Sequence, residues 1–405
     1  MVPMKHILCV TFVVLLFVNC VQATEVPFVE LKGHTDVVLP VKYSPDGKII
    51  VTGSADKTVR IWNAETGKEL HTLEGHTDTV LFIEFSPDRK NICTSGHDEL
   101  ARIWDIESGK NLLELKGRAS IFFPDGKRVA TVSWEEELTR IWNVESGKEL
   151  QTIVGGLPQF LPGEKKFITI HQDKTVRIWD TETGKELQKF KGEQYFFAHD
   201  DKKIATHSGD SSWIWDVESG KELHKVDAQS WDAEPEESLR KYVEQFGDFF
   251  YGGKPMVALA RWANTRSLDM QSESDLILMK FAVPTPDGKR IVAGSRENET
   301  FMFKIWDTES GKELHKLQGP FTENPFIFSP DGKKLITTCW DETFYLQIWD
   351  VESGKALKKL GGYTGEDYPR AFSPDGKKVV TARISDEGDN NVRIWDISAI
   401  MEDKQ

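Results

Sequence analysis

The sequence VRIWNAETGK, residues 59–68, decides the fold because close variants of it recur along the whole chain. The tripeptide Ile-Trp-Asp/Asn occurs eight times, and Glu-Ser/Thr-Gly-Lys follows it in seven of these places. The eight repeated tryptophans are Trp62, Trp104, Trp142, Trp179, Trp215, Trp306, Trp349 and Trp395. A repeat with a period near 40 residues indicates a series of similar small units rather than two or three independent domains.

A second repeated element lies ahead of each tryptophan. It is clearest at Pro45-Asp46-Gly47-Lys48, and it returns at residues 330–333 and 374–377. Glycine supplies the positive φ that such turns need, and short β-branched runs between turns predict strands. Each unit is therefore predicted to be a four-stranded antiparallel sheet.

This combination of motifs resembles the WD40 repeat family, over residues 26–396. The Gly-His element of that family stands at Gly33-His34 and Gly75-His76, and an Asp lies six residues before several of the tryptophans. The resemblance implies a buried network of His, Ser/Thr, Asp and Trp in each complete unit. The residues that it assigns to this network are His34, Ser54, Asp56 and Trp62 in the first unit, and His76, Ser95, Asp98 and Trp104 in the second.

The spacing of the tryptophans leaves the number of units open. Successive spacings are 36 to 46 residues, except for 91 residues between Trp215 and Trp306. Inside that gap, residues 249–257 match the Phe-Ser-Pro-Asp-Gly-Lys pattern, and Leu268 falls in the place of a tryptophan. We count a ninth, degenerate unit here. Since propellers usually have up to eight blades, the alternative is eight blades with an insertion at residues 226–275.

The two ends of the repeat region predict a closed ring. Residues 26–31 look like an outer strand without its own unit, and the last unit stops at Asp396, after its third strand. Together they complete one blade and remove the exposed edges of an open sheet. The predicted fold is all-β, a single closed β-propeller over residues 24–396, followed by a tail at 397–405.

Residues 1–23 have the layout of a secretory signal peptide, with Lys5, an apolar run at 7–18 and small residues before a cleavage site after Ala23. A retained anchor and a lipoprotein at Cys20 are the alternatives. We therefore expect an exported protein, periplasmic or secreted, with no membrane attachment after cleavage. The remaining cysteines, Cys93 and Cys339, fall in distant units, so we expect two free thiols.

The composition narrows the classes of partner. The chain of 405 residues has 51 Lys+Arg against 65 Asp+Glu, a net charge of -14. Nucleic acid, whose phosphates demand clustered Lys and Arg, is therefore disfavoured as a partner. The excess of acidic residues gathers in predicted turns such as residues 134–137 and 232–237. We expect a monomer that binds a basic protein or peptide.

Five tryptophans lie outside the repeat signature, and three of them fall in predicted turns between second and third strands, beside carboxylates. An amphipathic helix is predicted at residues 232–243 on the same face, with a partner-docking or a capping role. Exposed aromatic residues beside carboxylates suit a cationic partner. The candidate partner-binding residues are Trp134, Glu135, Glu136, Trp262, Trp340, Asp341, Tyr242 and Phe246.

The sequence lacks zinc-spaced cysteines, a phosphate-binding loop and a nucleophile elbow. His97, His171 and His207 lie in different units, so we do not expect them to form a metal site. Because these motifs are absent, we also expect no catalytic residue and no cofactor. The favoured hypothesis is a non-catalytic interaction scaffold. The alternatives are a propeller enzyme of the hydrolase or lactonase type and a glycan- or cell-wall-binding module.

Overall fold

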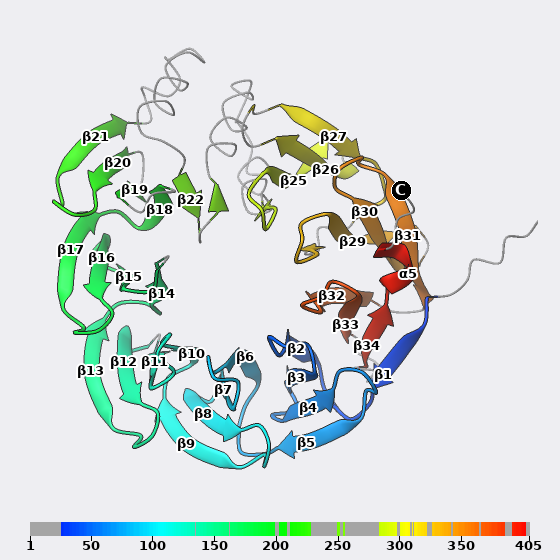
Figure 1. Cartoon of the computed structure of the whole chain (residues 1–405), viewed down its shortest axis with the longest axis horizontal. Coiled ribbons are helices and arrows are strands. Elements are labelled where there is room, and N and C mark those ends of the chain that lie inside the picture. Colours follow the sequence, from blue (N-terminus) through cyan, green and yellow to red (C-terminus); the bar gives the residue numbers. More distant parts are fainter. Residues whose placement is uncertain are drawn as a thin grey trace, which may run out of the picture.

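A computed structural model of the chain describes residues 26–227, 249–251, 254–255 and 283–401, with short gaps at 134, 162, 199–201, 209–210, 298–299, 308–309, 311, 322–325, 342, 364–365 and 385–390. Viewed down its shortest axis, the molecule is a ring of antiparallel sheets around a common centre (Figure 1). The fold is an all-β propeller of four-stranded blades, as the sequence predicts. The expected signal peptide at 1–23 lies outside the described residues.

The first four sheets follow one another along the chain. In each, the four strands lie in chain order from the centre of the ring to its rim. Sheet 1 contains β2 (Val38–Tyr43), β3 (Ile49–Ser54), β4 (Val59–Asn63) and β5 (Glu69–Leu73). Sheet 2 contains β6 (Val80–Phe85), β7 (Asn91–Gly96), β8 (Leu100–Asp105) and β9 (Asn111–Lys116). Sheet 3 contains β10 (Ala119–Phe122), β11 (Arg128–Ser133), β12 (Leu138–Asn143) and β13 (Glu149–Val154). Sheet 4 contains β14 (Gln159–Phe160), β15 (Lys166–His171), β16 (Thr175–Asp180) and β17 (Glu186–Lys191).

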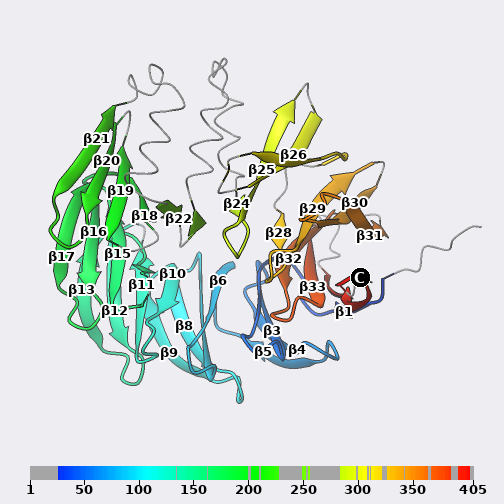
Figure 2. The same ribbon diagram turned by 45° about the horizontal axis from the view of Figure 1, so that its top comes forward.

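The other four sheets repeat this plan, and Figure 2 shows strands such as β18 to β21 side by side from centre to rim. Sheet 5 contains β18 (Gln194–Ala198), β19 (Lys203–Ser208), β20 (Ser211–Asp216) and β21 (Glu222–Asp227). Sheet 6 contains β24 (Val283–Pro284), β25 (Arg290–Glu297), β26 (Thr300–Asp307) and β27 (Glu313–Leu317). Sheet 7 contains β28 (Ile327–Phe328), β29 (Lys334–Trp340), β30 (Phe344–Asp350) and β31 (Ala356–Tyr363). Sheet 8 contains β32 (Glu366–Phe372), β33 (Lys378–Ile384), β34 (Val392–Asp396) and β1 (Phe28–Leu31).

The Pro-Asp-Gly turns join the first and second strands of a sheet. In sheet 1 the Ser44 hydroxyl donates a hydrogen bond to Asp46 Oδ1 at 2.6 Å, and the Gly47 N–H donates to the Ser44 carbonyl at 2.8 Å. Gly47 has a φ of +71°, a conformation that glycine adopts without steric cost. These local bonds end one strand and start the next at a fixed residue.

The Thr/Ser-Gly turns attach each sheet to its neighbour. In sheet 1, Asn63 Oδ1 accepts hydrogen bonds from the backbone N–H and the hydroxyl of Thr66, both at 2.8 Å. Gly67 has a φ of +69°, and a Cβ atom there would overlap with Val29 Cγ1 in β1. The turn therefore packs against the outer strand of the preceding sheet, and glycine is required both for its backbone angle and for the close contact.

The hydrophobic core consists of seven clusters, each between two consecutive sheets of the described part. The cluster between sheets 8 and 1 contains Trp62, Val380 and Ile394. Trp104 packs in the same way between sheets 1 and 2, and Trp395 between sheets 7 and 8. The repeated tryptophan thus fills the interface with the preceding sheet, which explains its recurrence once per unit.

The N-terminal strand completes the last sheet. β1 pairs with β34 in an antiparallel ladder in which Phe28 faces Trp395 and Leu31 faces Val392. The rings of Phe28 and Trp395 lie 4.8 Å apart, and Leu31 is buried against sheet 1. The first and last units of the chain are therefore joined through one sheet, as the unfinished ends of the repeats predict.

The expected ninth unit falls largely outside the described residues. Its described part is a short hairpin of β22 (Phe249–Tyr251) and β23 (Lys254–Pro255). β22 pairs with the inner strand of sheet 5, Phe197 opposite Phe250, so the hairpin extends that sheet to six strands. The described strands form eight sheets and no separate ninth one. The predicted helix at 232–243 lies outside the described residues.

The C-terminal segment continues beyond the last strand. Ile397 is fully buried, and the short helix α5 (Ser398–Met401) follows it. Cys93 and Cys339 are both buried free thiols, as expected. No helix among the described residues has the length and apolar character needed to cross a membrane.

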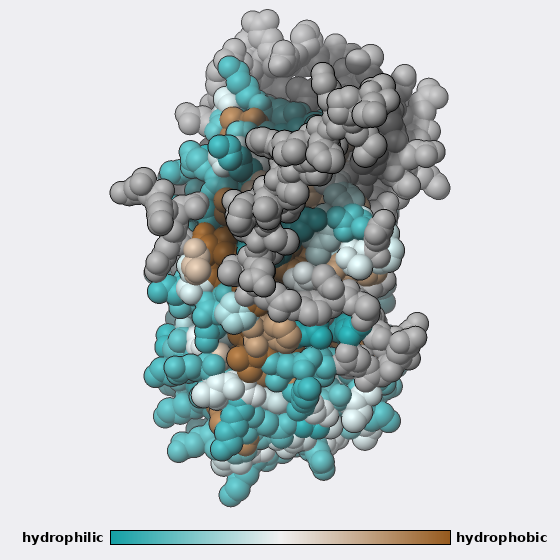
Figure 3. Space-filling model, turned by 90° about the vertical axis from the view of Figure 1, so that its right-hand side faces the viewer, coloured by the Kyte–Doolittle hydropathy of each residue, from teal (hydrophilic) through white to brown (hydrophobic). Residues whose placement is uncertain are grey.

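The rim of the ring is mainly hydrophilic, with small apolar patches; Figure 3 shows one side of it. One exposed leucine recurs at the same place in six outer strands: Leu70, Leu112, Leu150, Leu187, Leu223 and Leu314. Single exposed leucines of this kind are normal on protein surfaces.

Candidate partner-binding site

The turns between second and third strands share one end of the ring with the connections between sheets, because the strands of each sheet are antiparallel. We call this end the connection face; it includes residues 33–37, 55–58, 135–137, 341 and 343. In sheet 1, hydrogen bonds tie the two kinds of segment together. The Ser54 hydroxyl donates to the Asp36 carbonyl at 2.9 Å, and the Thr35 N–H donates to Asp56 Oδ2 at 3.0 Å.

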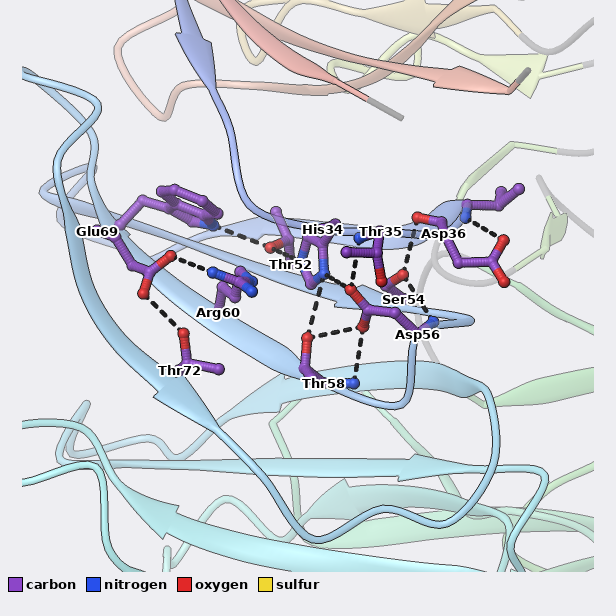
Figure 4. Close-up of polar contacts among 12 residues, drawn as sticks. His34, Thr35, Asp36, Thr52, Ser54, Asp56, Thr58, Arg60, Glu69 and Thr72 are labelled. Atoms are coloured by element: carbon purple, nitrogen blue, oxygen red, sulfur yellow. Dashed lines mark hydrogen bonds and ion pairs between the residues drawn. The ribbon is translucent and has the colours of Figure 1, made fainter. Parts of the chain in front are cut away.

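Beneath this face of sheet 1 lies a buried polar network (Figure 4). His34 Nδ1 lies 2.8 Å from Asp56 Oδ2, and His34 Nε2 lies 2.7 Å from Thr52 Oγ1. The Trp62 indole N–H donates to the same Thr52 oxygen at 2.9 Å. Burial raises the pKa of Asp56, but hydrogen bonds from His34 and Thr58 outweigh it and hold this pKa well below its usual range.

The hydroxyl group of this network is Thr52, and the expectation of Ser54 was wrong. Ser54 lies two residues further along β3, about 6–7 Å nearer the turn at the usual rise of a strand. Its hydroxyl bonds the Asp36 carbonyl and accepts from the Asp56 N–H at 3.0 Å. Ser54 therefore orders the turn, while Thr52 connects the histidine to the tryptophan.

Sheet 2 has the same network with an added arginine. His76 lies 2.9 Å from Asp98 Oδ2 and 2.9 Å from Thr94 Oγ1, and the Trp104 N–H donates to Thr94 at 2.8 Å. Arg102 Nη1 adds a 2.8 Å ion pair to Asp98.

In sheet 2 the expectation of Ser95 was also wrong. Adjacent side chains point to opposite faces of a strand. Ser95 therefore faces sheet 3, where its hydroxyl lies 3.4 Å from that of Ser120, and Thr94 serves the network.

The pair of threonine hydroxyl and tryptophan N–H is more constant than the histidine. It occurs in seven sheets with donor–acceptor distances of 2.7 to 3.0 Å. The threonines are Thr52, Thr94, Thr131, Thr169, Thr206, Thr337 and Thr381. Sheet 6 is the exception: Ala293 holds the threonine position in the strand register, and Trp306 Nε1 is buried without a hydrogen-bond partner among the described residues.

Sheet 4 contains a histidine that our sequence reasoning did not place in a network. His171 Nε2 lies 2.7 Å from Thr169 Oγ1, which also accepts from Trp179. His171 thus occupies the role of His34, although it comes from the end of β15 rather than from the connection between sheets. The signal that could have found it is the alternation Thr169-x-His171-x-Asp173 ahead of the tryptophan.

Among the candidate partner-binding residues, Trp340 is the tryptophan that the structure describes. It ends β29 on the connection face and is 48% exposed. Its ring lies 4.4 Å from that of Phe344, which begins β30. Beside it, Asp341 Oδ2 accepts a 3.0 Å bond from Lys359 Nζ, which also lies 3.9 Å from the Tyr345 ring centroid. We call these five residues the Trp340 cluster.

The remaining candidates are only partly described. Glu135 and Glu136 are exposed in the turn after β11, and Glu136 pairs with Arg140 of β12. Trp134, Trp262, Tyr242 and Phe246 lie outside the described residues. The described carboxylates are therefore less free than the sequence suggests, because Glu136 and Asp341 each pair with a cation of their own sheet.

The described residues contain no group of three His, Cys, Asp or Glu side chains placed to hold a metal ion. Each network histidine instead bonds a threonine.

Comparison with known proteins identifies the repeats. The family model for the WD domain, G-beta repeat (WD40), matches residues 25–63, 67–105 and 367–396. Protein Mut11 of Chlamydomonas reinhardtii is 52% identical over 42 residues, 10% of this chain and 11% of Mut11. The ribosome biogenesis protein BOP1 homolog of Drosophila grimshawi is 50% identical over 42 residues, 10% of this chain and 5% of that protein. The matched stretch thus spans about a tenth or less of these relatives.

Among solved structures, the computationally designed Ika8 protein aligns with a TM-score of 0.54, covering 91% of this chain and 98% of that chain at 20% identity. This likeness concerns the fold alone. The networks of sheets 1 and 2 lie within the segments that the family model matches. Three segments of the chain therefore match the WD40 repeat, and the propeller fold agrees with that match.

Proposed function

We propose that this protein is a non-catalytic interaction scaffold whose connection face binds a protein or peptide partner. WD40 repeats generally mediate protein interactions. In the described residues the histidines of sheets 1, 2 and 4 are engaged in networks that stabilise the sheets, which favours a structural role over a catalytic one.

The observation that carries the proposal is the exposure of Trp340 within the Trp340 cluster. A half-exposed tryptophan stacked edge-on with a second aromatic ring offers apolar area together with a polar edge. Glu135, exposed elsewhere on the same face, adds negative charge that favours a basic partner. The attraction between a cation and an aromatic ring is strongest where water is excluded. An arginine or lysine of the partner would therefore lie over the Trp340 ring.

The test is a binding comparison with three tryptophans of the proposed face changed. The intact protein and the variant with Trp134, Trp262 and Trp340 changed to Ala are used to capture partners from the exported fraction of the source. The control is Leu150→Ala, which removes a side chain of similar exposure from the rim. We expect the triple variant to lose its specific partners while the control keeps them. An unaltered bound set in the triple variant refutes the assignment of the face.

We also propose that the chain is exported, on the strength of the signal-like sequence at residues 1–23. Cell fractionation of the full chain, with Val14→Arg in the apolar run as the variant, tests this step separately. Export of the intact chain and retention of the variant are expected.

A further inference from the structure

A cavity of about 500 Å³ lies where the inner strands of several sheets converge. It is lined by residues of β2, β6, β10, β28 and β32, and by Leu157 ahead of β14. In Figure 1 the labels of β2, β6, β10 and β32 mark this inner side of the ring. The half-buried apolar side chains that face it are Leu39, Leu81, Phe82, Ile121, Leu157 and Ile327.

Two cations line this cavity, and they differ in their partners. Lys42 forms an ion pair with Glu84 across β2 and β6, so its charge is neutralised within the wall. Arg370 of β32 has no ion pair with any carboxylate of the described residues. Its Nη2 lies 3.5 Å from the Val38 carbonyl, and its guanidinium carbon lies 6.0 Å from the Tyr368 ring centroid. Its Nε is buried, with no hydrogen-bond partner in the part of the chain that the structure describes.

This arrangement distinguishes Arg370 from other arginines of the ring. Eight arginines in the described residues have a carboxylate within 4 Å: Arg60, Arg102, Arg118, Arg128, Arg140, Arg177, Arg290 and Arg393. A partly buried guanidinium without a counter-ion is costly because it loses hydration without gaining a charge partner. In line with this, burial lowers the pKa of Arg370 from its ordinary value.

An anion that reaches Arg370 from the cavity would supply the missing partner, and guanidinium groups bind carboxylates through two parallel hydrogen bonds. The rest of such a ligand would lie against the leucine, isoleucine and phenylalanine side chains of the wall. We propose that the central cavity binds a small apolar carboxylate, with its carboxylate on Arg370 and its hydrocarbon part on the inner strands. The volume falls within the usual range of small-molecule sites. None of the five residues of the Trp340 cluster lines this cavity.

The first test uses the intact protein and three eight-carbon probes in titration calorimetry: octanoate, octan-1-ol and octylammonium. We expect octanoate to bind with one site per chain and at least tenfold more tightly than the alcohol. Octylammonium is expected not to bind. Lengthening the carboxylate from six to eight carbons should tighten binding by about fourfold per methylene group. Equal binding of octanoate and octan-1-ol would overturn the proposal, because it would leave no role for the cation.

The second test removes the cation. Arg370→Gln is expected to weaken octanoate binding at least tenfold, whereas Arg290→Gln, which removes an arginine paired with Glu352 at the exterior, should leave it unchanged. Circular dichroism checks that both variants fold. A folded Arg370→Gln protein that binds octanoate like the parent refutes the assignment. Octanoate and N-acetyl-leucine share the apolar carboxylate, and their relative affinity distinguishes a fatty acid from the C-terminus of a peptide as its source.

Discussion

A threonine hydroxyl bonds both a histidine and the tryptophan indole in sheets 1, 2 and 4. In sheets 1 and 2 one oxygen accepts from the tryptophan indole and bonds the histidine, so removing it disturbs two buried polar groups at once. In sheet 6 the threonine position is Ala293, which faces Lys304 in the ladder as Thr52 faces Arg60. The buried Trp306 N–H therefore lacks an acceptor within the described residues, and a single hydroxyl at position 293 could supply one.

We predict that Ala293→Thr raises the free energy of unfolding by about 1 kcal/mol, because it supplies an acceptor to Trp306. The reverse change in the next sheet, Thr337→Ala, removes the acceptor of Trp349 and should lower it by about 1–3 kcal/mol. Urea denaturation followed by tryptophan fluorescence measures both. If Ala293→Thr also shifts the urea midpoint in a Trp306→Phe background, the added stability does not come from this bond.

His171 makes the stability depend on pH. Burial, followed by the nearby Arg177, lowers its pKa from 6.5 to about 4. Since the folded state takes up its proton at a lower pH than the unfolded chain, stability falls as the pH drops from about 6.5 to about 4. We predict that His171→Gln removes part of this loss, measured as the melting temperature at intervals across that range. The exposed His97→Gln is the control, and an identical pH profile for parent and His171→Gln contradicts the prediction.

At the scale of the element, the Thr/Ser-Gly turn acts as an inter-sheet contact as well as a chain reversal. Gly67 lies against Val29, Gly109 against His71 and Gly354 against His315. His71 and His315 also bond backbone carbonyls of those turns, at 2.9 and 2.6 Å. The outer strand of one sheet therefore contacts the turn of the next, and this contact fixes the relative position of neighbouring sheets.

Gly67→Ala and Gly163→Ala separate the two reasons for a glycine in such a turn, its positive φ and its close contact with a neighbouring strand. Both residues have positive φ, at +69° and +79°, but a Cβ at Gly163 has no atom within 4 Å. We predict that each change costs about 1–2 kcal/mol for the left-handed backbone, with a further 1–3 kcal/mol or so at Gly67 for displacing Val29. Thermal unfolding of the two variants measures the difference. If the two variants lose equal stability, Val29 of β1 moves aside for the added methyl group without an energetic cost.

Much of each element was predictable from the repeats. The Pro-Asp-Gly and Thr-Gly signals fix where strands start and end because their hydrogen bonds are local. The residue that supplies the network hydroxyl was not predictable from the sequence. Thr52 and Ser54 lie on one face of β3, and only their distance from Trp62 decides between them. Likewise, residues 249–255 have the local pattern of a repeat, yet β22 pairs with β18. Strand pairing depends on tertiary contacts that a local pattern does not contain.

At the scale of the whole molecule, the ring depends on the joint between its two ends. Clusters of apolar side chains hold consecutive described sheets together. Among the described strands, β1 is the one that joins the start of the repeat region to sheet 8. Its contribution combines the ladder to β34, the burial of Leu31 and the ion pair of Glu30 with Arg393 at 3.3 Å. Without β1, the edge of β34 would present unpaired backbone groups and a row of apolar side chains.

We predict that deleting residues 26–31 lowers the melting temperature and produces concentration-dependent dimers, because exposed strand edges pair with other chains. Light scattering after size exclusion measures the dimers. A peptide of residues 26–33 added in trans should restore the monomer and raise the melting temperature. The same peptide with Leu31→Lys should not, since this side chain is only 2% exposed between sheets 8 and 1. A truncated chain that stays monomeric and melts like the parent would show that packing between sheets, rather than the β1–β34 ladder, holds the ring together.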